Sequence, residues 1–193
     1  MKRFLKANLR GWGMALVLAA APLVLTGCFD VTPPGPTDLS AVEKQVFDAI
    51  NSIRQANGLY ALTTQAGLGG VARAHSEDML ARDYLSHVTP EGKNPGDRIA
   101  DAGIAVTAWG ENIAMSQGLT DPVDAIVQGW MDSPGHRENI LRTTFTHTGV
   151  GVAQSGDTFY FTQVFAALPA AKSAPEPSRG WLDALRALIF PGG

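Results

Sequence analysis

Cysteine is nearly absent from this sequence: among 193 residues only Cys28 carries a thiol, and it follows an apolar leader. Any domain beyond Cys28 therefore has no disulfide and no cysteine nucleophile, so its hydrophobic core has to stabilise it. The chain also lacks the phosphate-binding patterns G-x-x-x-x-G-K and G-x-G-x-x-G, and the G-x-S-x-G elbow. These absences argue against a nucleotide-binding domain and against an α/β-hydrolase.

Positive charge is scarce outside the first ten residues. Four of the 15 Lys and Arg residues lie in MKRFLKANLR, and the apolar run GWGMALVLAAAPLVL follows directly. This order predicts a secretory signal peptide over residues 1–27. Its removal leaves 11 basic residues against 18 acidic ones, a net charge of about −7 at pH 7. Nucleic acid and anionic lipid surfaces are therefore unfavourable partners.

The lone cysteine ends the sequence LTGC, which is similar to the processing site of bacterial lipoproteins. We therefore predict that Cys28 becomes the lipid-carrying first residue, modified with palmitate, of an exported extracellular protein. The lipid anchors it to the bacterial cell membrane or the outer membrane. Two alternatives stay open, an ordinary signal peptide with an incidental cysteine and a membrane-spanning anchor, although the apolar run is short for a bilayer and contains a proline.

The rest of the chain divides by composition into four parts. Residues 28–37 form a proline-rich tether, and residues 38–168 have the length of one domain with one core. Residues 169–179 form a second linker, and residues 180–193 predict a short amphipathic helix. This helix either docks on the domain or contacts a membrane surface or a partner; the sequence leaves both open.

Within the domain, helical patterns come first and strand patterns last. Helices are predicted from a Ser40–Glu43 capping box to the NG pair at 57–58, over about 64–84, in NPGDRIADAG, after Asp121, and in SPGHRENIL. The runs THTGVGVAQ and TFYFTQVFA then predict two strands joined by a turn at SGD. This order indicates an α+β fold in which helices cover the sheet.

The segment SPGHRENIL places a histidine at the start of a helix. Ser133 suits the N-cap and Pro134 the first helical position, so His136 becomes the third helical residue. The partial positive charge at that end disfavours protonation, and a neutral imidazole can bind a metal or accept a proton. Alternatively, His136 is a structural residue that completes the helix cap, with the Ser133 hydroxyl committed as cap acceptor.

Few other polar residues have a context that indicates chemistry. Glu111, in WGENIA, lies among apolar residues, and a buried glutamate needs a hydrogen-bonding or cationic partner such as a histidine or a metal ion. His87, in YLSHVTP, lies in a predicted loop after a helix. His75 lies on an apolar helix stripe, which favours a core histidine. The H-E-x-x-H zinc motif is absent, because Ile140 stands four residues after His136.

Six motifs in succession resemble one known family. They are INSIRQANGL, AHSEDMLARDYLSH, GENIA, GWMDSPGHRENIL, TGVGVA and YFTQVF. Over about residues 40–167 the chain is similar to the bacterial, SCP-like branch of the CAP superfamily, which includes cysteine-rich secretory proteins, antigen 5 and plant pathogenesis-related proteins. The resemblance implies an α-β-α sandwich with a small antiparallel sheet between helical layers. It also implies an open cleft of histidines and acids that can hold a divalent cation, often zinc.

The resemblance assigns roles to individual residues. His87 and Glu111 match the family histidine and the GEN glutamate, His136 replaces a missing glutamate, and Tyr160 stands where the family has a second histidine. The implied metal ligands are therefore His87, Glu111 and His136, a set that with one water suits zinc or another divalent cation. His75, Ser133 and Tyr160 are further candidates for the cleft.

Two functions follow from this interpretation. The first is a lipid-anchored binding module at the cell surface that takes a lipid, a peptide or a wall-derived ligand. The second is a metal-assisted, peptidase-like hydrolase in which Glu111 acts as general base. No nucleic-acid partner is expected, and the oligomeric state is left open.

Overall fold

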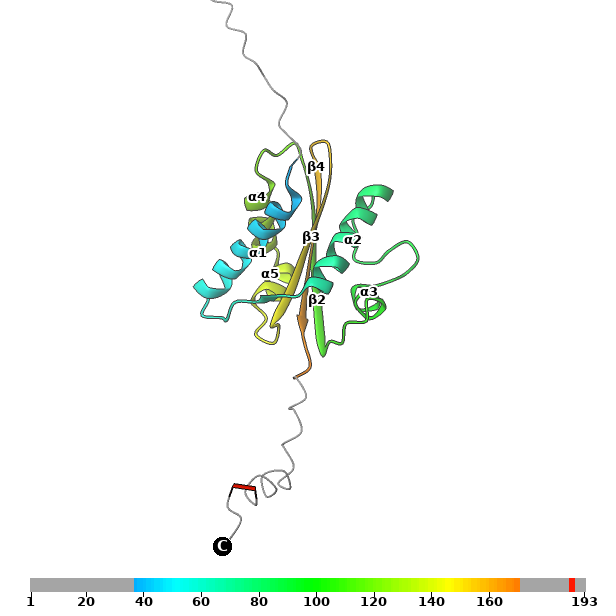
Figure 1. Ribbon diagram of the computed structural model, residues 1–193. Coiled ribbons are helices and arrows are strands. Elements are labelled where there is room, and N and C mark those ends of the chain that lie inside the picture. The colour runs from blue at the N-terminus through cyan, green and yellow to red at the C-terminus, as the bar shows by residue number, and fades with distance from the viewer. Residues whose placement is uncertain (1–36, 171–187, 190–193) are drawn as a thin grey trace, which may run out of the picture. The chain divides into compact units, whose positions relative to one another are not determined.

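The computed structural model of the chain describes residues 37–170 and 188–189 (Figure 1). The predicted signal peptide, the lipidation site Cys28 and almost all of the predicted C-terminal helix lie outside the described residues. Among the helices that are described, none has both the length and the apolar character needed to cross a bilayer.

A four-stranded sheet forms the middle of the domain. Its strands are β1 (Thr63–Thr64), β2 (Ala108–Gln117), β3 (His147–Ser155) and β4 (Thr158–Ala167), in the spatial order β1-β3-β4-β2. The β3–β4 pair is antiparallel, as predicted for the hairpin, and β4 also pairs antiparallel with β2, whereas β1 pairs in parallel with β3. The sheet is therefore mixed, because the short β1 enters from the segment after the first helix rather than through a hairpin.

Helices cover both faces of this sheet (Figure 1). On one face lie α1 (Leu39–Ala56), α4 (Pro122–Asp132) and α5 (Pro134–Leu141), and on the other lie α2 (Ala66–Arg82) and α3 (Pro95–Asp101). Each face has its own apolar core, the larger one around Trp130 and the smaller one around Leu68. The predicted α+β class and α-β-α sandwich are confirmed.

Two glycines of β3 allow α2 to lie directly on the sheet. A Cβ added to Gly149 would lie 2.1 Å from the Gly69 nitrogen, and one added to Gly151 would lie 2.0 Å from the Arg73 nitrogen. At this close contact the Ser76 hydroxyl donates to the Gly151 carbonyl at 3.0 Å. The backbone of α2, and with it the segment that leaves α2 toward the site, is therefore fixed against β3.

Some predicted local features differ from the structure. The N-cap of α1 is Asp38, whose carboxylate accepts from the Ser40 and Ala41 amides, so the Ser40–Glu43 capping box is wrong. Glu43 accepts instead from Arg73 of α2 and from the Val152 amide at 3.1 Å. Because the Glu43 carboxylate binds a strand amide and a guanidinium, it does not cap the N-terminus of its own helix. The strand β2 was not predicted either.

Candidate functional site

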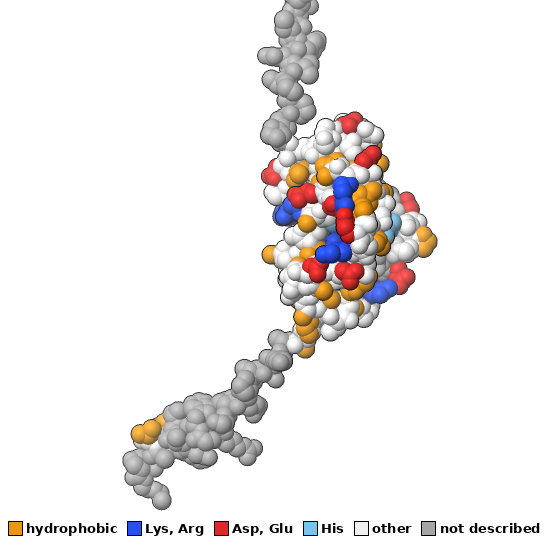
Figure 2. Space-filling model, turned by 90° about the vertical axis from the view of Figure 1, so that its right-hand side faces the viewer, with side chains coloured by type: hydrophobic (Ala, Val, Ile, Leu, Met, Phe, Trp, Pro, Cys, Tyr) orange, Lys and Arg blue, Asp and Glu red, His pale blue; other side chains and the backbone are white. Residues whose placement is uncertain are grey.

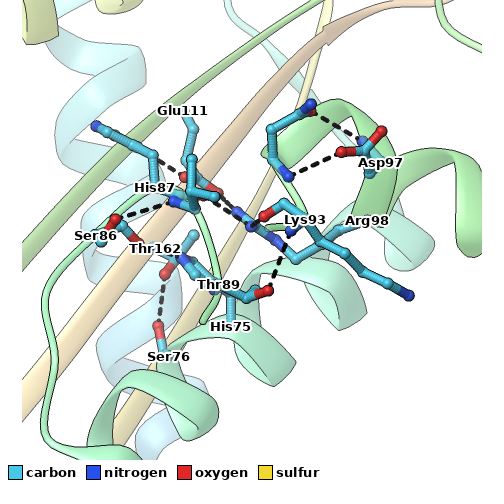
Figure 3. A network of polar contacts seen from close by, with 12 residues as sticks. His75, Ser76, Ser86, His87, Thr89, Lys93, Asp97, Arg98, Glu111 and Thr162 are labelled. Atoms are coloured by element: carbon cyan, nitrogen blue, oxygen red, sulfur yellow. Dashed lines mark hydrogen bonds and ion pairs between the residues drawn. The ribbon is translucent and has the colours of Figure 1, made fainter. Parts of the chain in front are cut away.

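Strand β2 places Glu111 at the centre of a polar cluster (Figure 3). Its side chain is only 1% exposed, and both carboxylate oxygens have partners. Oε1 lies 2.8 Å from His87 Nδ1, and Oε2 lies 2.6 Å from Arg98 Nη2. His87 and Glu111, which are 24 residues apart in sequence, therefore meet in the fold.

Arg98 is the residue of this cluster that was not predicted from the sequence. It lies on α3, which begins with a capping box between Asn94 and Asp97. Besides the bond to Glu111, its Nη1 donates to the His87 carbonyl at 2.8 Å and to the Lys93 carbonyl at 3.1 Å. One guanidinium therefore holds both the carboxylate and the loop that carries the histidine. The signal that could have found it was the need of a buried glutamate for a cation, which arginine also meets.

The contact with Glu111 sets the orientation of the His87 ring. An ionised carboxylate only accepts hydrogen bonds, so Nδ1 of His87 carries the proton that points to Oε1. In the neutral ring Nε2 is then the acceptor, and the side chain is 46% exposed. This is the arrangement in which a carboxylate fixes one nitrogen of an imidazole and leaves the other to a ligand or a reacting group.

His136 lies at the third position of α5, as predicted, and is half-buried. Burial, and secondarily the nearby charge of His87, lower the pKa of His136 below its ordinary value of 6.5. The neutral form expected from the sequence is thus favoured, with burial as the main cause. Ser133 makes no side-chain cap hydrogen bond, so the expectation that its hydroxyl is committed to the cap is wrong.

Two asparagines tie α5 to β2. Asn112 Nδ2 donates to the His136 carbonyl at 3.2 Å, and Asn139 Nδ2 donates to the Glu111 carbonyl at 3.1 Å. The two side chains also bond to each other at 3.0 Å. Because the helix end is held by these side chains, His136 keeps its place near His87 without a hydroxyl cap.

The other cleft candidates are buried. His75 is 1% exposed, and its Nε2 lies 2.9 Å from the Ser86 carbonyl, which agrees with the prediction of a core histidine. Tyr160 is 4% exposed and packs with Met79 and Ile113, and burial raises the pKa of its phenol. Both side chains therefore belong to the interior, and neither offers an exposed polar group beside His87.

The predicted metal ligands do not fit a three-ligand centre. Glu111 uses both oxygens on His87 and Arg98, and it would have to release one of them to bind a cation. Within the residues that the structure describes, no group of three or more His, Cys, Asp or Glu side chains is arranged to hold a metal. The histidine nitrogens that Glu111 does not contact are the only donors of the predicted set left for a cation.

A buried glutamate that fixes an exposed histidine, on an α-β-α sandwich, is the feature to compare with known proteins. The model of the CAP family, the cysteine-rich secretory proteins, matches residues 47–165, and the chain belongs to this family. The chain is 40% identical over 136 residues to the Bacillus subtilis (strain 168) protein YkwD. It is also 40% identical over 123 residues to YlbC of the same strain, a protein described as a membrane protein.

The solved structures give the same fold. An extracellular protein from Bacillus anthracis that contains an SCP domain is 34% identical, with a TM-score of 0.61, over 69% of this chain. The match spans 45% of that chain, 51% of YkwD and 34% of YlbC. This chain therefore shares its CAP domain with proteins that carry much additional sequence.

Proposed function

We propose that this protein is an exported binding module, lipid-anchored through Cys28, that captures a lipid, a peptide or a wall-derived ligand at the cleft of His87, Glu111 and His136. The observation that carries this proposal is the buried Glu111–Arg98 ion pair, whose side chains are 1% and 11% exposed. Burying such a pair costs desolvation energy, and here it orients a half-exposed imidazole. In return for this cost, the protein has at its surface a hydrogen-bonding group, the His87 imidazole, whose orientation is fixed.

The surroundings of His87 favour an amphipathic ligand. Leu85 and Val88, close to the histidine in sequence, are 51% and 45% exposed. A ligand at this loop can therefore cover apolar side chains and place one polar group on the imidazole. Peptides and lipids with a polar headgroup combine an apolar part with a polar group in this way. A highly charged ligand would gain nothing from the apolar side chains.

Binding is tested on the soluble Cys28→Ser chain, produced without its signal peptide, with three probes: laurate, a blocked tripeptide and a soluble muropeptide. We expect at least one of them to shift the ¹⁵N resonances of the His87 ring saturably. Glu111→Gln should weaken that binding about tenfold, since the amide no longer fixes the ring with a charge-assisted hydrogen bond. His147→Gln, on β3 and separated from β2 by β4, is the matched control. Unchanged affinity in Glu111→Gln contradicts the proposed site.

The anchor is tested separately. We expect the full-length protein in the membrane fraction and its Cys28→Ser variant in the soluble fraction. The names of two relatives, an extracellular SCP-domain protein and a membrane protein, support an envelope location for this one. A Cys28→Ser protein that still sediments with membranes would show that another segment anchors the chain.

A hydrolase is the second candidate, and the His87–Glu111 contact favours a particular form of it. Glu111 is poorly placed as general base because both of its oxygens are engaged, whereas Nε2 of His87 is free to accept a proton. Hydrolysis of the tripeptide or the muropeptide that is abolished by His87→Gln and reduced by Glu111→Gln would support an enzyme. Absence of turnover by the wild type, with and without added zinc, removes this candidate.

Zinc binding remains a separate proposal. Calorimetric titration of the wild type, His136→Ala and Glu111→Gln distinguishes the arrangements. One-to-one binding lost in both variants would establish the three-ligand set, with Arg98 displaced from Glu111. Binding that survives Glu111→Gln but not His136→Ala would place the cation on the histidines.

A further inference from the structure

A cavity of about 430 Å³ adjoins the His87–Glu111 site through Arg98. His75, Asp78 and Arg82 of α2 line one side, and Glu91, Lys93 and Arg98 line the other. In Figure 3 His75 lies beneath the segment that runs from Thr89 through Lys93 to Arg98. Arg98 thus belongs both to this cavity and to the Glu111 ion pair.

The charges around this cavity are balanced. Arg82 pairs with Asp78 at 2.6 Å and also with Glu91, and this pair lowers the pKa of Glu91 to about 2. Lys93 pairs with Asp101 at 2.6 Å, and Arg98 with Glu111 at 2.6 Å. Figure 2, which views the molecule from the α2 and α3 side, shows basic and acidic side chains next to each other on this face. A cavity lined by compensated ion pairs favours a neutral ligand over an ion.

Two buried polar atoms of the lining residues lack a partner within the described part of the chain. They are Nδ1 of His75 and Nε of Arg98. The Ser86 carbonyl can only accept, so Nε2 of His75 carries the ring proton and Nδ1 is left as an acceptor. Burial lowers the pKa of His75, which keeps the ring neutral. The Arg98 Nε–H is always a donor.

We propose that this cavity binds a neutral hydroxyl compound, such as a sugar, through one hydroxyl that donates to His75 Nδ1 and accepts from Arg98 Nε. A hydroxyl group is complementary to this pair, because it donates and accepts at the same oxygen. A carboxylate or a phosphate would place lone pairs against the His75 acceptor, and an ammonium group would face the Arg98 donor. Unlike the proposed function, this site makes no use of His87 or His136.

Access to the two atoms requires a local movement. Both atoms are buried, so we expect the hydroxyl to reach them only if the segment 83–94, which carries Glu91 and Lys93 of the lining, moves away from α2. The exposed ion pair between Arg82 and Glu91 links these two parts. Removing it with Glu91→Gln should therefore speed association while leaving both hydrogen-bonding atoms in place.

The test uses the Cys28→Ser chain with methyl α-D-glucopyranoside as the probe. The ¹⁵N resonance of His75 Nδ1 reports binding wherever His75 is present, and calorimetric titration gives the affinity of every variant. We expect a saturable shift. In His75→Gln the amide nitrogen can replace Nε2 toward Ser86, but no acceptor stands at Nδ1, so affinity should fall about tenfold. Arg98→Lys keeps a positive charge beside Glu111 but lacks the Nε–H, and it should lower the affinity for the sugar to a similar degree. His147→Gln should bind as the wild type does.

Two outcomes would overturn this proposal. A His75 Nδ1 resonance that is hydrogen-bonded without the sugar and unchanged by it would mean that the cavity holds water only. Sugar binding that shifts His87 but leaves His75 unchanged would assign the sugar to the cleft of the proposed function instead. Loss of laurate or peptide binding at His87, with the His75 response intact, would leave this inference standing while the proposed function failed.

Discussion

Two arginines, Arg54 buried and Arg98 partly buried, organise different regions of this domain, and their partners differ in kind. Arg54 of α1 is 2% exposed and donates to four carbonyls, those of Tyr60, Ile140, Arg142 and Phe145, at 2.7 to 3.4 Å. None of its hydrogen-bond partners in the described chain is a carboxylate. Burial therefore lowers its pKa, with no opposing charge to raise it.

Arg98 instead has a carboxylate partner. Its guanidinium joins Glu111 to the carbonyls of His87 and Lys93. The two side chains therefore have different roles. Arg54 donates hydrogen bonds to loop carbonyls and fixes the chain after α5. Arg98 instead uses its charge to keep a buried carboxylate beside a histidine. We expect the loss of Arg54 to affect stability alone and the loss of Arg98 to affect stability and the site together.

The largest effect should follow from Arg54→Met. This change leaves four carbonyls without a donor, and it should lower the free energy of unfolding by about 3–5 kcal/mol, since removal of the buried charge offsets only part of the loss. Urea denaturation followed by circular dichroism measures it. Arg142→Met, which removes the exposed pair with Glu138, should cost less than about 1 kcal/mol. Equal effects of the two changes would mean that Arg54 does not stabilise these loops.

Arg98→Met should cost about 2–4 kcal/mol, because its partner Glu111 stays buried without the Arg98 counter-charge. We expect a smaller loss than at Arg54, since the Arg98 side chain is 11% exposed and Glu111 keeps His87 as a partner. The double variant Arg98→Met, Glu111→Gln removes that charge and should recover part of the stability. The ¹⁵N spectrum of the His87 ring should change in both variants, whereas Arg54→Met should leave it as in the wild type. If the His87 spectrum does not change in Arg98→Met, the proposed difference between the roles of the two arginines is wrong.

The pH dependence of stability should come from histidines and not from either arginine. Burial lowers the pKa of His75 and of His136 from 6.5. Below about pH 6.5 the unfolded chain therefore binds protons that the folded chain does not, and the free energy of unfolding falls as the pH falls. Denaturation between pH 7.5 and about pH 5 measures the slope. The double variant His75→Gln, His136→Gln should flatten it, and an unchanged slope would assign the effect to other groups.

The part of the fold that could be predicted is the part with a regular apolar period. The helix pattern over 64–84 corresponds to α2, and the two β-branched runs correspond to the β3–β4 hairpin. Strand β2 escaped because its buried positions include Glu111, Asn112 and Ser116, so that the polar residues conceal the strand. Buried polar groups are where local patterns give the least information, since their partners come from elsewhere in the chain.

The same reason separates the predicted and the missed parts of the site. The family resemblance pointed to His87 and Glu111, whereas their spacing in the sequence did not show that they meet. Arg98 lies on a helix of only seven residues, and nothing near it in sequence marks its partner. Its role depends on the position of α3 against β2, which tertiary packing determines.

The smallest effect is expected at Ser133, where the sequence and the structure disagree. A helix that depends on its N-cap hydroxyl loses about 1 kcal/mol when that residue becomes alanine. Ser133 makes no such bond, and α5 is held at its start by Asn112 and at its end by Arg54. Ser133→Ala should therefore change the free energy of unfolding by less than about 0.3 kcal/mol, whereas Asn94→Ala, which removes a cap bond of 3.1 Å on α3, should cost about 1 kcal/mol. Equal losses at the two positions would show that α5 needs its own cap, and that Arg54 contributes less to this helix than its hydrogen bonds indicate.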